Sequence, residues 1–260
     1  MEKALGYLEI ATASGCNLKC RGCSHFSNIV ERTSLVTVEE FHRDMARLSE
    51  IVPFIYTIRL LGGEPLLNPD IDRLAEEGRR YYPESHIWIV TNGLLLPKLS
   101  EEKLTNLAKC GTEIQISMYP PTLRQMPDIA RVLDSHKIKY SCSDPITVFR
   151  KRMNLHGNSE PEFEFQHCPV GKDCHYLDRG KLSVCPAPQV ASVLEDRFGL
   201  DMKGKEEDIL DIHDPEVTFD FIERFLAKTP SMCRFCTKPV LFDWETAGKP
   251  ALKDWIVEGL

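Results

Sequence analysis

The chain has 260 residues, of which 42% are hydrophobic and 27% are charged, so it can bury a sizeable core. This balance is typical of a soluble globular protein and excludes the collagen-like, low-complexity and disordered classes. The formal net charge of −7 gives no general attraction to nucleic acid or to an anionic membrane, and neither is expected as a partner.

The start of the sequence does not predict export. Residues 1–13 contain Glu2 and Lys3 and lack a long apolar run followed by a small-residue cleavage site. No apolar run approaches the roughly 20 residues that span a bilayer. We therefore expect a cytoplasmic protein, whose ten cysteines stay reduced and indicate metal binding or catalysis more than disulfides.

Predicted strands and helices alternate along the first part of the chain. The apolar patterns predict strands at residues 7–12, 56–61, 86–90, 113–118 and 137–142. They predict intervening helices that begin at Thr37, at Asn68, after Ser100 and near Pro127. Thr37 and Glu40 fit a capping box at the first of these helices. Such alternation indicates parallel strands joined by right-handed crossovers.

The length of this region decides between forms of α/β fold. Five strand–helix units occupy about 140 residues, with room for one more, whereas a complete eight-unit barrel takes about 250 residues. We therefore predict a partial (β/α)6 TIM-like barrel over residues 1–150. Beyond residue 150 the alternation fades, which predicts a small C-terminal domain over residues 151–260 with one clear helix at 217–228.

Eight of the ten cysteines fall into two groups. The first thiol group, in the loop after the first predicted strand, is Cys16, Cys20 and Cys23. The second thiol group is Cys168, Cys174, Cys185, Cys233 and Cys236. The two remaining cysteines, Cys110 and Cys142, are expected to be small buried side chains.

The first thiol group suits either of two metal centres. Structural zinc usually has four ligands, so a zinc ion would need His25 beside the three thiolates. A 4Fe–4S cubane can instead be held by three cysteines, which leaves one iron without a protein ligand. That open iron could bind a further molecule.

Three segments taken together resemble the radical S-adenosylmethionine (SAM) superfamily. The segments are Cys16-x3-Cys20-x2-Cys23, Gly62-Gly63-Glu64-Pro65 and Thr91-Asn92-Gly93. The resemblance implies that the three cysteines hold a 4Fe–4S cluster and that SAM chelates its open iron. Adjacent glycines also let the backbone approach a ligand closely. The residues expected to bind the cofactor are Gly62, Gly63, Glu64, Pro65, Asn92 and, from alternation on the fourth strand, Ser117.

One position departs from the family pattern. The residue before the third cysteine is often aromatic in the family and packs on adenine, whereas here it is Gly22. Phe26 is a candidate for that missing ring.

The second thiol group also has two interpretations. Cys233-x2-Cys236 has the spacing of a zinc knuckle, so the group could form a zinc ribbon. The pattern Gly180-x4-Cys185, with a cysteine upstream and a CxxC downstream, instead resembles the SPASM/twitch extension of radical SAM enzymes, which carries auxiliary 4Fe–4S clusters. The short twitch form implies one auxiliary cluster. Such a cluster needs four thiolates, and Cys168 is preferred to Cys174 as the fourth.

The resemblance implies the reaction. Reductive cleavage of SAM gives methionine and a 5′-deoxyadenosyl radical, which abstracts hydrogen from a substrate. An auxiliary cluster that takes an electron favours a dehydrogenase or epimerase acting on a small polar substrate such as a sugar, cyclitol or nucleotide sugar. An external one-electron reductant of the flavodoxin or ferredoxin type is expected. Candidate substrate contacts are Glu9, Tyr119, Arg150 and Arg152.

Two other functions stay open at this point. A peptide- or protein-modifying enzyme, like the sulfatase maturases or the maturases of ribosomal peptides, would use the same cofactors. A zinc-binding interaction module would hold about two zinc ions and catalyse nothing. Iron analysis after anaerobic purification separates the zinc module from both enzymes.

Overall fold

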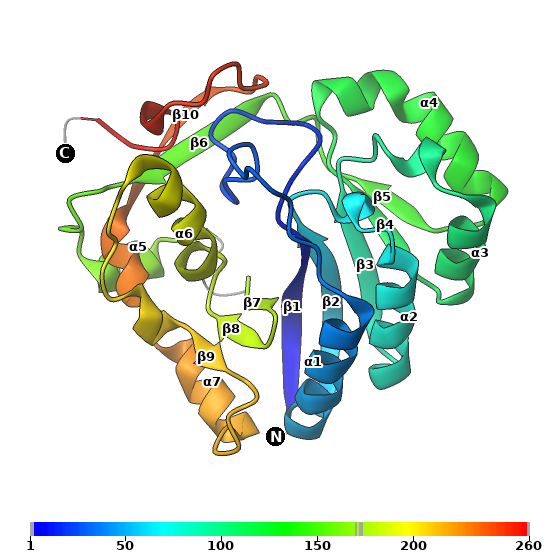
Figure 1. The fold of residues 1–260 in the computed structure, drawn as a ribbon, viewed down its shortest axis with the longest axis horizontal. Helices are drawn as coiled ribbons and strands as arrows, with labels where there is room; N and C mark the ends of the chain where they lie inside the picture. Colours follow the sequence, from blue (N-terminus) through cyan, green and yellow to red (C-terminus); the bar gives the residue numbers. More distant parts are fainter. Residues whose placement is uncertain (1–2, 170, 172–173, 259–260) are drawn as a thin grey trace.

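The computed structural model describes residues 3–169, 171 and 174–258 (Figure 1). Five parallel strands form the first part of its main sheet, as the alternating pattern predicts. They are β1 (Ala4–Ala13), β2 (Phe54–Gly62), β3 (His86–Thr91), β4 (Glu113–Ile116) and β5 (Tyr140–Cys142). The connecting helices are α1 (Val38–Ile51), α2 (Ile71–Tyr81), α3 (Glu101–Lys109) and α4 (Pro120–Ser135).

The starts of these helices follow local capping chemistry. The Thr37 hydroxyl accepts from Glu40 N and the Glu40 carboxylate accepts from Thr37 N, so the predicted capping box of α1 is confirmed. Ser100 caps α3 through its hydroxyl. Helix α4 begins at Pro120 rather than near Pro127, because proline fits the first helical turn, where N–H groups have no intrahelical partner.

The second half of the chain adds strands to the main sheet. β7 (Tyr176–Asp178) pairs in parallel with β1 on the edge opposite β2. β8 (Lys181–Ser183) and β9 (Leu210–Asp211) continue the sheet in antiparallel fashion, which gives the order β5-β4-β3-β2-β1-β7-β8-β9. β6 (Val148–Met153) and β10 (Cys236–Asp243) form a separate antiparallel pair. Strands from both sides of residue 150 therefore share one sheet, and the division into residues 1–150 and 151–260 stays a prediction.

Three helices lie in the described residues of this second half, and the sequence predicts only the last of them. They are α5 (Pro161–Gln166), α6 (Ala187–Phe198) and α7 (Phe219–Ala227). Short 3-10 turns are η1 (Pro65–Leu67), η2 (Leu96–Lys98), η3 (Lys205–Asp208), η4 (Ser231–Phe235) and η5 (Leu252–Asp254). Within the described ranges, no helix combines the length and apolar character needed to cross a membrane.

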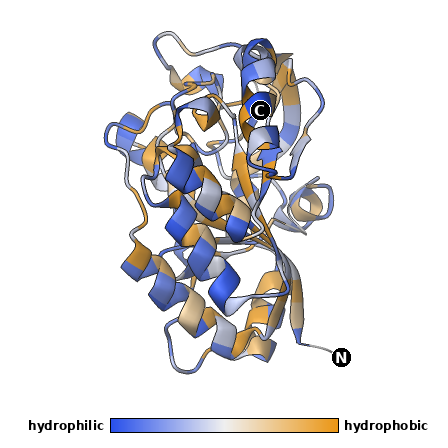
Figure 2. Ribbon diagram, turned by 90° about the vertical axis from the view of Figure 1, so that its right-hand side faces the viewer, coloured by the Kyte–Doolittle hydropathy of each residue, from blue (hydrophilic) through white to orange (hydrophobic). Residues whose placement is uncertain are grey.

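The two faces of the main sheet have different surroundings. Leu8 of β1 is buried in the core that the sheet shares with its helices. Ala11 packs instead with Leu61 of β2 on the opposite face, which we call the inner face. Figure 2 shows helices striped with hydrophilic and hydrophobic residues, as expected where one side of each helix contacts the sheet. Because side chains alternate along a strand, Tyr7 and Glu9 share the inner face with Ala11.

Candidate functional site

The first thiol group lies in the loop after β1, and its thiols are close neighbours. Cys16 Sγ accepts from Asn92 Nδ2 at 3.7 Å, and Cys20 Sγ accepts from the indole of Trp244 at 3.2 Å. Burial raises the pKa of Cys16 to about 11 and that of Cys20 to about 12, and the nearby Cys23 thiolate adds repulsion in both cases. These two thiols therefore keep their protons until a metal displaces them.

The turn after β2 packs directly against this cysteine loop. Gly63 N donates to Ala13 O at 2.7 Å. Glu64 N donates to Gly15 O at 2.9 Å. A Cβ on Gly63 would lie only 2.0 Å from Gly15 O. Gly62 has a φ of +133°, and a Cβ there would meet the backbone of Ala13 at the end of β1, so both glycines are needed for this close approach.

The Glu64 carboxylate joins the turns after β2 and β3. It is 1% exposed and accepts from Thr91 Oγ1 at 2.5 Å and from Asn92 N at 3.0 Å. It also accepts from Leu66 N at 3.1 Å. Burial raises the pKa of Glu64 to about 7, although these hydrogen bonds favour its charged form. Glu64 therefore holds the two turns together, while a direct contact between its carboxylate and SAM stays a prediction.

The other residues predicted to bind the cofactor gather at the same end of the sheet. Pro65 is buried at the start of η1. Asn92 follows β3 and reaches the Cys16 thiol. Ser117 N donates to Thr91 O at 2.8 Å, which places Ser117 directly beyond β4. These residues lie at the carboxyl ends of β2, β3 and β4, the end at which β1 leads into the cysteine loop.

The donor set at this end fits an iron–sulfur cluster. Within the described residues, no three His, Cys, Asp or Glu side chains are placed around the position of a single metal ion. A cubane is bound by thiolates on different irons, so its ligands need not meet at one point. The first thiol group meets this requirement, because its three neighbouring thiols lie on one loop. The turn that packs behind this loop has no room for a Cβ at Gly63.

The C-terminal part of the chain fills the space beside Gly22. Gly22 has a φ of +63°, and a Cβ there would lie 2.7 Å from the Phe242 ring and 2.8 Å from Asp254 O. Phe26 is buried in a separate hydrophobic cluster, where its ring lies 5.9 Å from that of Trp255. The packing of Phe242 therefore explains why position 22 carries no aromatic side chain.

Four members of the second thiol group lie close together. Burial raises the pKa of Cys185, and the thiolates of Cys236 and Cys233 add to the rise. Burial also raises the pKa of Cys233 to about 12, with further contributions from Cys236 and Cys168. Arg152 Nη1 donates to Cys168 Sγ at 3.3 Å. A cluster with four cysteine ligands would find these four within one neighbourhood.

None of the three remaining cysteines is fully buried. Cys110 is partly exposed and Cys142 is exposed, so the expectation that both are small buried side chains is wrong. Cys110 lies at the end of α3, and Cys142 ends β5, an edge strand with a neighbour on one side. Cys174 is partly exposed, and its role as a cluster ligand stays a prediction.

A polar network lies on the inner face of β1, β2 and β4. Tyr7 Oη donates to Glu9 Oε1 at 2.7 Å, and Arg59 Nη1 lies 3.7 Å from the same carboxylate oxygen. The Arg59 guanidinium also donates to Tyr7 Oη and to Gln115 Oε1. Burial raises the pKa of Glu9. Of this network, only Glu9 is among the predicted substrate contacts. Arg59 and Gln115 each lie between buried apolar neighbours in the sequence, and this alternation is the signal that their side chains face inward.

The four residues predicted to contact substrate have different surroundings. Glu9 belongs to the polar network. The Tyr119 ring lies 5.6 Å from that of Trp244, and burial together with the first thiol group raises the pKa of Tyr119 above its usual range. Arg152 contacts the second thiol group, whereas Arg150 of the same strand is exposed. The four residues therefore have different neighbours, although Arg150 and Arg152 both lie on β6.

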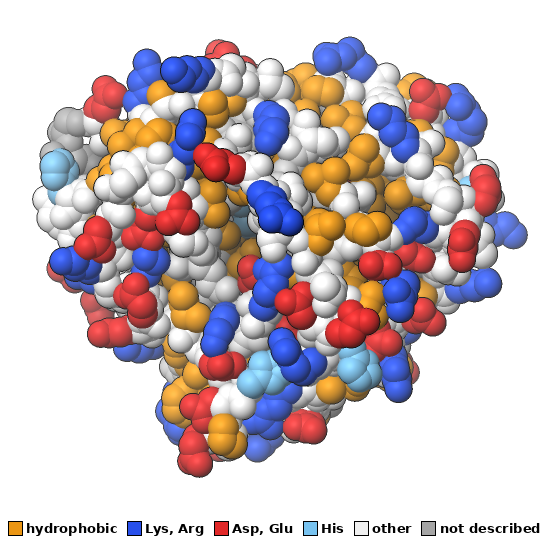
Figure 3. Space-filling view, viewed as in Figure 1, with side chains coloured by type: hydrophobic (Ala, Val, Ile, Leu, Met, Phe, Trp, Pro, Cys, Tyr) orange, Lys and Arg blue, Asp and Glu red, His pale blue; other side chains and the backbone are white. Residues whose placement is uncertain are grey.

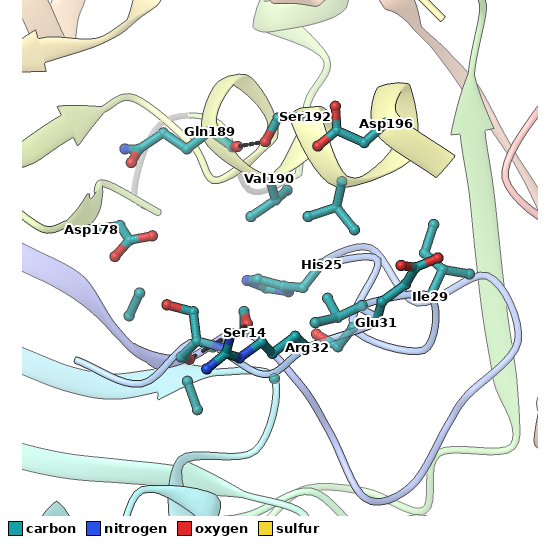
Figure 4. Close-up of a pocket in the computed structure, with 18 of the residues that line it drawn as sticks. Ser14, His25, Ile29, Glu31, Arg32, Asp178, Gln189, Val190, Ser192 and Asp196 are labelled. Carbon is teal, nitrogen blue, oxygen red and sulfur yellow. Dashed lines mark hydrogen bonds between the residues drawn. The ribbon is translucent and has the colours of Figure 1, made fainter. Parts of the chain in front are cut away.

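A cavity of about 450 Å³ lies between the loop that follows the cysteines and helix α6 (Figure 4). Ser14 and Gly63 line it beside the first thiol group. Gln189 lines it on α6, which begins shortly after Cys185. Figure 4 shows His25 between the two sides, and Figure 3 shows charged side chains of both signs around a hollow on this face.

Two side chains that line the cavity carry buried polar atoms without a hydrogen-bond partner among the described residues. They are His25, at Nε2, and Ser27, at Oγ. Burial lowers the pKa of His25 to about 4, so the neutral ring offers one donor and one acceptor. Leaving such atoms unpaired costs about 1–3 kcal/mol each, which a ligand with hydroxyl groups would offset.

A family model and several sequence relatives match parts of the chain. Residues 10–138 match the family described as the Radical SAM superfamily. Molybdenum cofactor biosynthesis protein 1 of Homo sapiens is 33% identical over 135 residues, which are 51% of this chain and 20% of that protein. GTP 3′,8-cyclase of Petrotoga mobilis is 23% identical over 212 residues, which are 74% of this chain and 62% of the relative. The chain thus spans less than two thirds of each of these relatives.

A solved structure resembles almost the whole chain. BtrN in complex with AdoMet and 2-DOIA matches 92% of this chain and 95% of its own, with a TM-score of 0.53 and 21% identity. This likeness concerns the fold, and it confirms the predicted α/β class, a partial barrel followed by a small C-terminal part. Residues 10–138, which include the first thiol group and both glycine-containing turns, match the Radical SAM superfamily, and this part of the chain is therefore assigned to that family.

Proposed function

We propose that this protein is a radical SAM enzyme that oxidises or epimerises a small polar substrate, such as a sugar, cyclitol or nucleotide sugar. The observation that carries the proposal is the cavity of about 450 Å³ that is lined by Ser14 and Gly63, which are near the first thiol group in the site, and by Gln189 of α6. Cavities of about 300–1,000 Å³ are typical of small-molecule sites. The size of the cavity, together with the polar and charged side chains among its lining residues, therefore favours a small substrate over a folded peptide partner.

The cofactor site is proposed at the carboxyl ends of β1 to β4. Cys16, Cys20 and Cys23 would hold a 4Fe–4S cluster, and Gly62, Gly63, Pro65, Asn92 and Ser117 would border SAM. Glu64 keeps the two turns in register through its buried hydrogen bonds. When bound, the cluster and SAM supply the one-electron chemistry that produces a radical able to take hydrogen from the substrate.

The inner face supplies groups for the substrate. Glu9 lies on the same face of β1 as Ala11, which lines the cavity, and the raised pKa of Glu9 suits a group that accepts a proton. Arg59 and Tyr7 fix the Glu9 carboxylate. His25 and Ser27 would bind substrate hydroxyls through their unpaired atoms.

Oxidation by two electrons also needs an electron acceptor close to the substrate. Removal of a hydrogen atom and then a proton leaves one electron to be transferred. Cys168, Cys185, Cys233 and Cys236, which lie close together, would bind the auxiliary 4Fe–4S cluster that receives it. A one-electron donor of the flavodoxin or ferredoxin type would reduce the first cluster.

The test is isotope transfer in anaerobically reconstituted protein. We expect about eight irons per chain. We expect SAM cleavage that is lost in a Cys16→Ala, Cys20→Ala, Cys23→Ala variant. Deuterium should move from a perdeuterated cyclitol or sugar into 5′-deoxyadenosine. Transfer from peptides alone would replace the proposal with a peptide-modifying function, and zinc without iron would refute both.

A further inference from the structure

The segment that follows β10 runs alongside the cysteine loop. Arg21 N donates to Glu245 O at 2.9 Å. Ala247 N donates to Lys19 O at 2.7 Å, on the other side of a bridge at Cys20. Figure 1 shows β10 and the chain after it at the same end of the molecule as this loop. Residues 244–247 therefore form a short antiparallel cover over residues 19–21.

Charge and packing fix this cover in place. Arg21 Nη1 lies 2.5 Å from a Glu245 carboxylate oxygen, and Arg21 Nε lies 2.8 Å from a carboxylate oxygen of buried Asp254. The same guanidinium lies over the Phe242 ring, 5.4 Å from its centroid. Phe242 in turn occupies the space beside Gly22. The cover is thus held by the contacts of Arg21 and by the ring that packs on Gly22, the residue before the third cysteine.

Two tryptophans donate to the cysteine loop, and they reach different acceptors. Trp244 Nε1 donates to Cys20 Sγ at 3.2 Å, where the cysteine is 7% exposed. Trp255 Nε1 donates to the main-chain oxygen of Cys23 at 2.9 Å. The first bond acts on an atom that would bind iron, whereas the second acts on the backbone of the loop.

We propose that Trp244 is a positioning residue that raises the reduction potential of the cluster held by the first thiol group. The inference rests on the proposed function, because it assumes that Cys20 is a cluster ligand. A reduced cluster carries more negative charge on its sulfur ligands than an oxidised one. An N–H donor to a ligand sulfur therefore stabilises the reduced form more strongly. The bond also lies in partly buried surroundings, between the Tyr119 ring and the loop, where water competes less.

The experiment compares Trp244→Phe with Trp255→Phe in reconstituted holoenzyme. The midpoint potential is measured by anaerobic redox titration of the electron paramagnetic resonance signal that changes when SAM is added. For Trp244→Phe we expect about a tenfold lower ratio of reduced to oxidised cluster at a fixed potential, equivalent to about 59 mV for one electron. Trp255→Phe is the matched control, since it removes an indole donor from the same loop without touching sulfur. It should unfold at a lower temperature and keep the wild-type potential.

Each outcome bears on the inference. An unchanged midpoint potential in Trp244→Phe, or an equal shift in both variants, overturns the role of Trp244. In that case SAM cleavage by the wild type still supports the proposed function. Absence of a SAM-sensitive cluster in the wild type overturns the proposed function itself. If Trp244→Phe holds no cluster, electron–nuclear double resonance of the wild type in D2O decides. We expect coupling to an exchangeable indole hydrogen that 15N-labelled tryptophan identifies, and its absence overturns the inference.

Discussion

Glu64→Gln tests whether the carboxylate that joins the two turns is uncharged in the folded protein at acidic pH. Glutamine keeps the size of the side chain and removes its titrating proton. Burial raises the pKa of Glu64 from 4.5 to about 7. The folded state therefore binds the proton more tightly than the unfolded chain. It follows that the wild-type protein loses stability as the pH rises through this window.

The size of the effect follows from the two pKa values. Their separation corresponds to about 3 kcal/mol of unfolding free energy, at about 1.4 kcal/mol for each pH unit. The wild-type protein is expected to lose about 2 kcal/mol of this unfolding free energy between about pH 5.5 and about pH 8.5. Glutamine has no such dependence, but its NH2 group faces a donor, Thr91 Oγ1 or Asn92 N. Glu64→Gln should therefore be less stable than the wild type at the lower pH, by about 1–3 kcal/mol.

The assay is urea unfolding of both metal-free proteins at the two pH values. Subtracting the variant from the wild type cancels the groups that titrate alike in both. We expect the advantage of the wild type at acidic pH to shrink by about 2 kcal/mol at alkaline pH. An advantage that stays constant or grows with pH would show that Glu64 is ionised when folded, and the reasoning from burial would be refuted.

Three further changes test other parts of the structure. Gly63→Ala places a Cβ 2.0 Å from a backbone oxygen of the cysteine loop and should lose most of its cluster iron, whereas Gly6→Ala, with nothing within 4 Å, should keep it. Cys168→Ser should lower the iron content from about eight to about four per chain and Cys174→Ser should leave it unchanged, while the reverse result would exchange the two ligands. Main-chain hydrogen bonding at the start of α1 lowers the pKa of Glu40 in the folded protein. The charged carboxylate therefore stabilises the wild-type protein above the pKa that Glu40 has in the unfolded chain, and this stabilisation is lost as the pH falls through the folded pKa. Glu40→Gln should remove it. Thermal melts at about pH 7 and about pH 3 measure this, and equal losses at both would contradict it.

Local signals account for the elements that the sequence predicts. The capping box at Thr37 and the alternation within β1 depend on residues a few positions apart, and both are found as expected. The sequence does not fix the start of α4, because Pro120 and Pro121 suit a β-turn as well as a first helical turn. The spacing of the first three cysteines likewise identifies a loop before any long-range contact is known.

Long-range partners are what the sequence does not predict. Strand β7 is three residues long, so it shows no period, and it pairs with β1 across most of the chain. Trp244 reaches Cys20 over 224 positions, with no motif that links them. Arg152 is predicted to contact substrate, yet its donation to Cys168 depends on the fold of a loop that periodicity does not describe.

The pairing of β1 with β7 has a consequence for biosynthesis. β1 leaves the ribosome before β7, and its edge opposite β2 stays open until residues 176–178 have been made. The thiol of Cys20 acquires its indole neighbour later still, with residue 244. A nascent chain that stalls before these points presents an unpaired strand edge and accessible thiols, which invite aggregation and oxidation. Insertion of a cluster into its final surroundings therefore waits until residue 244 has been translated.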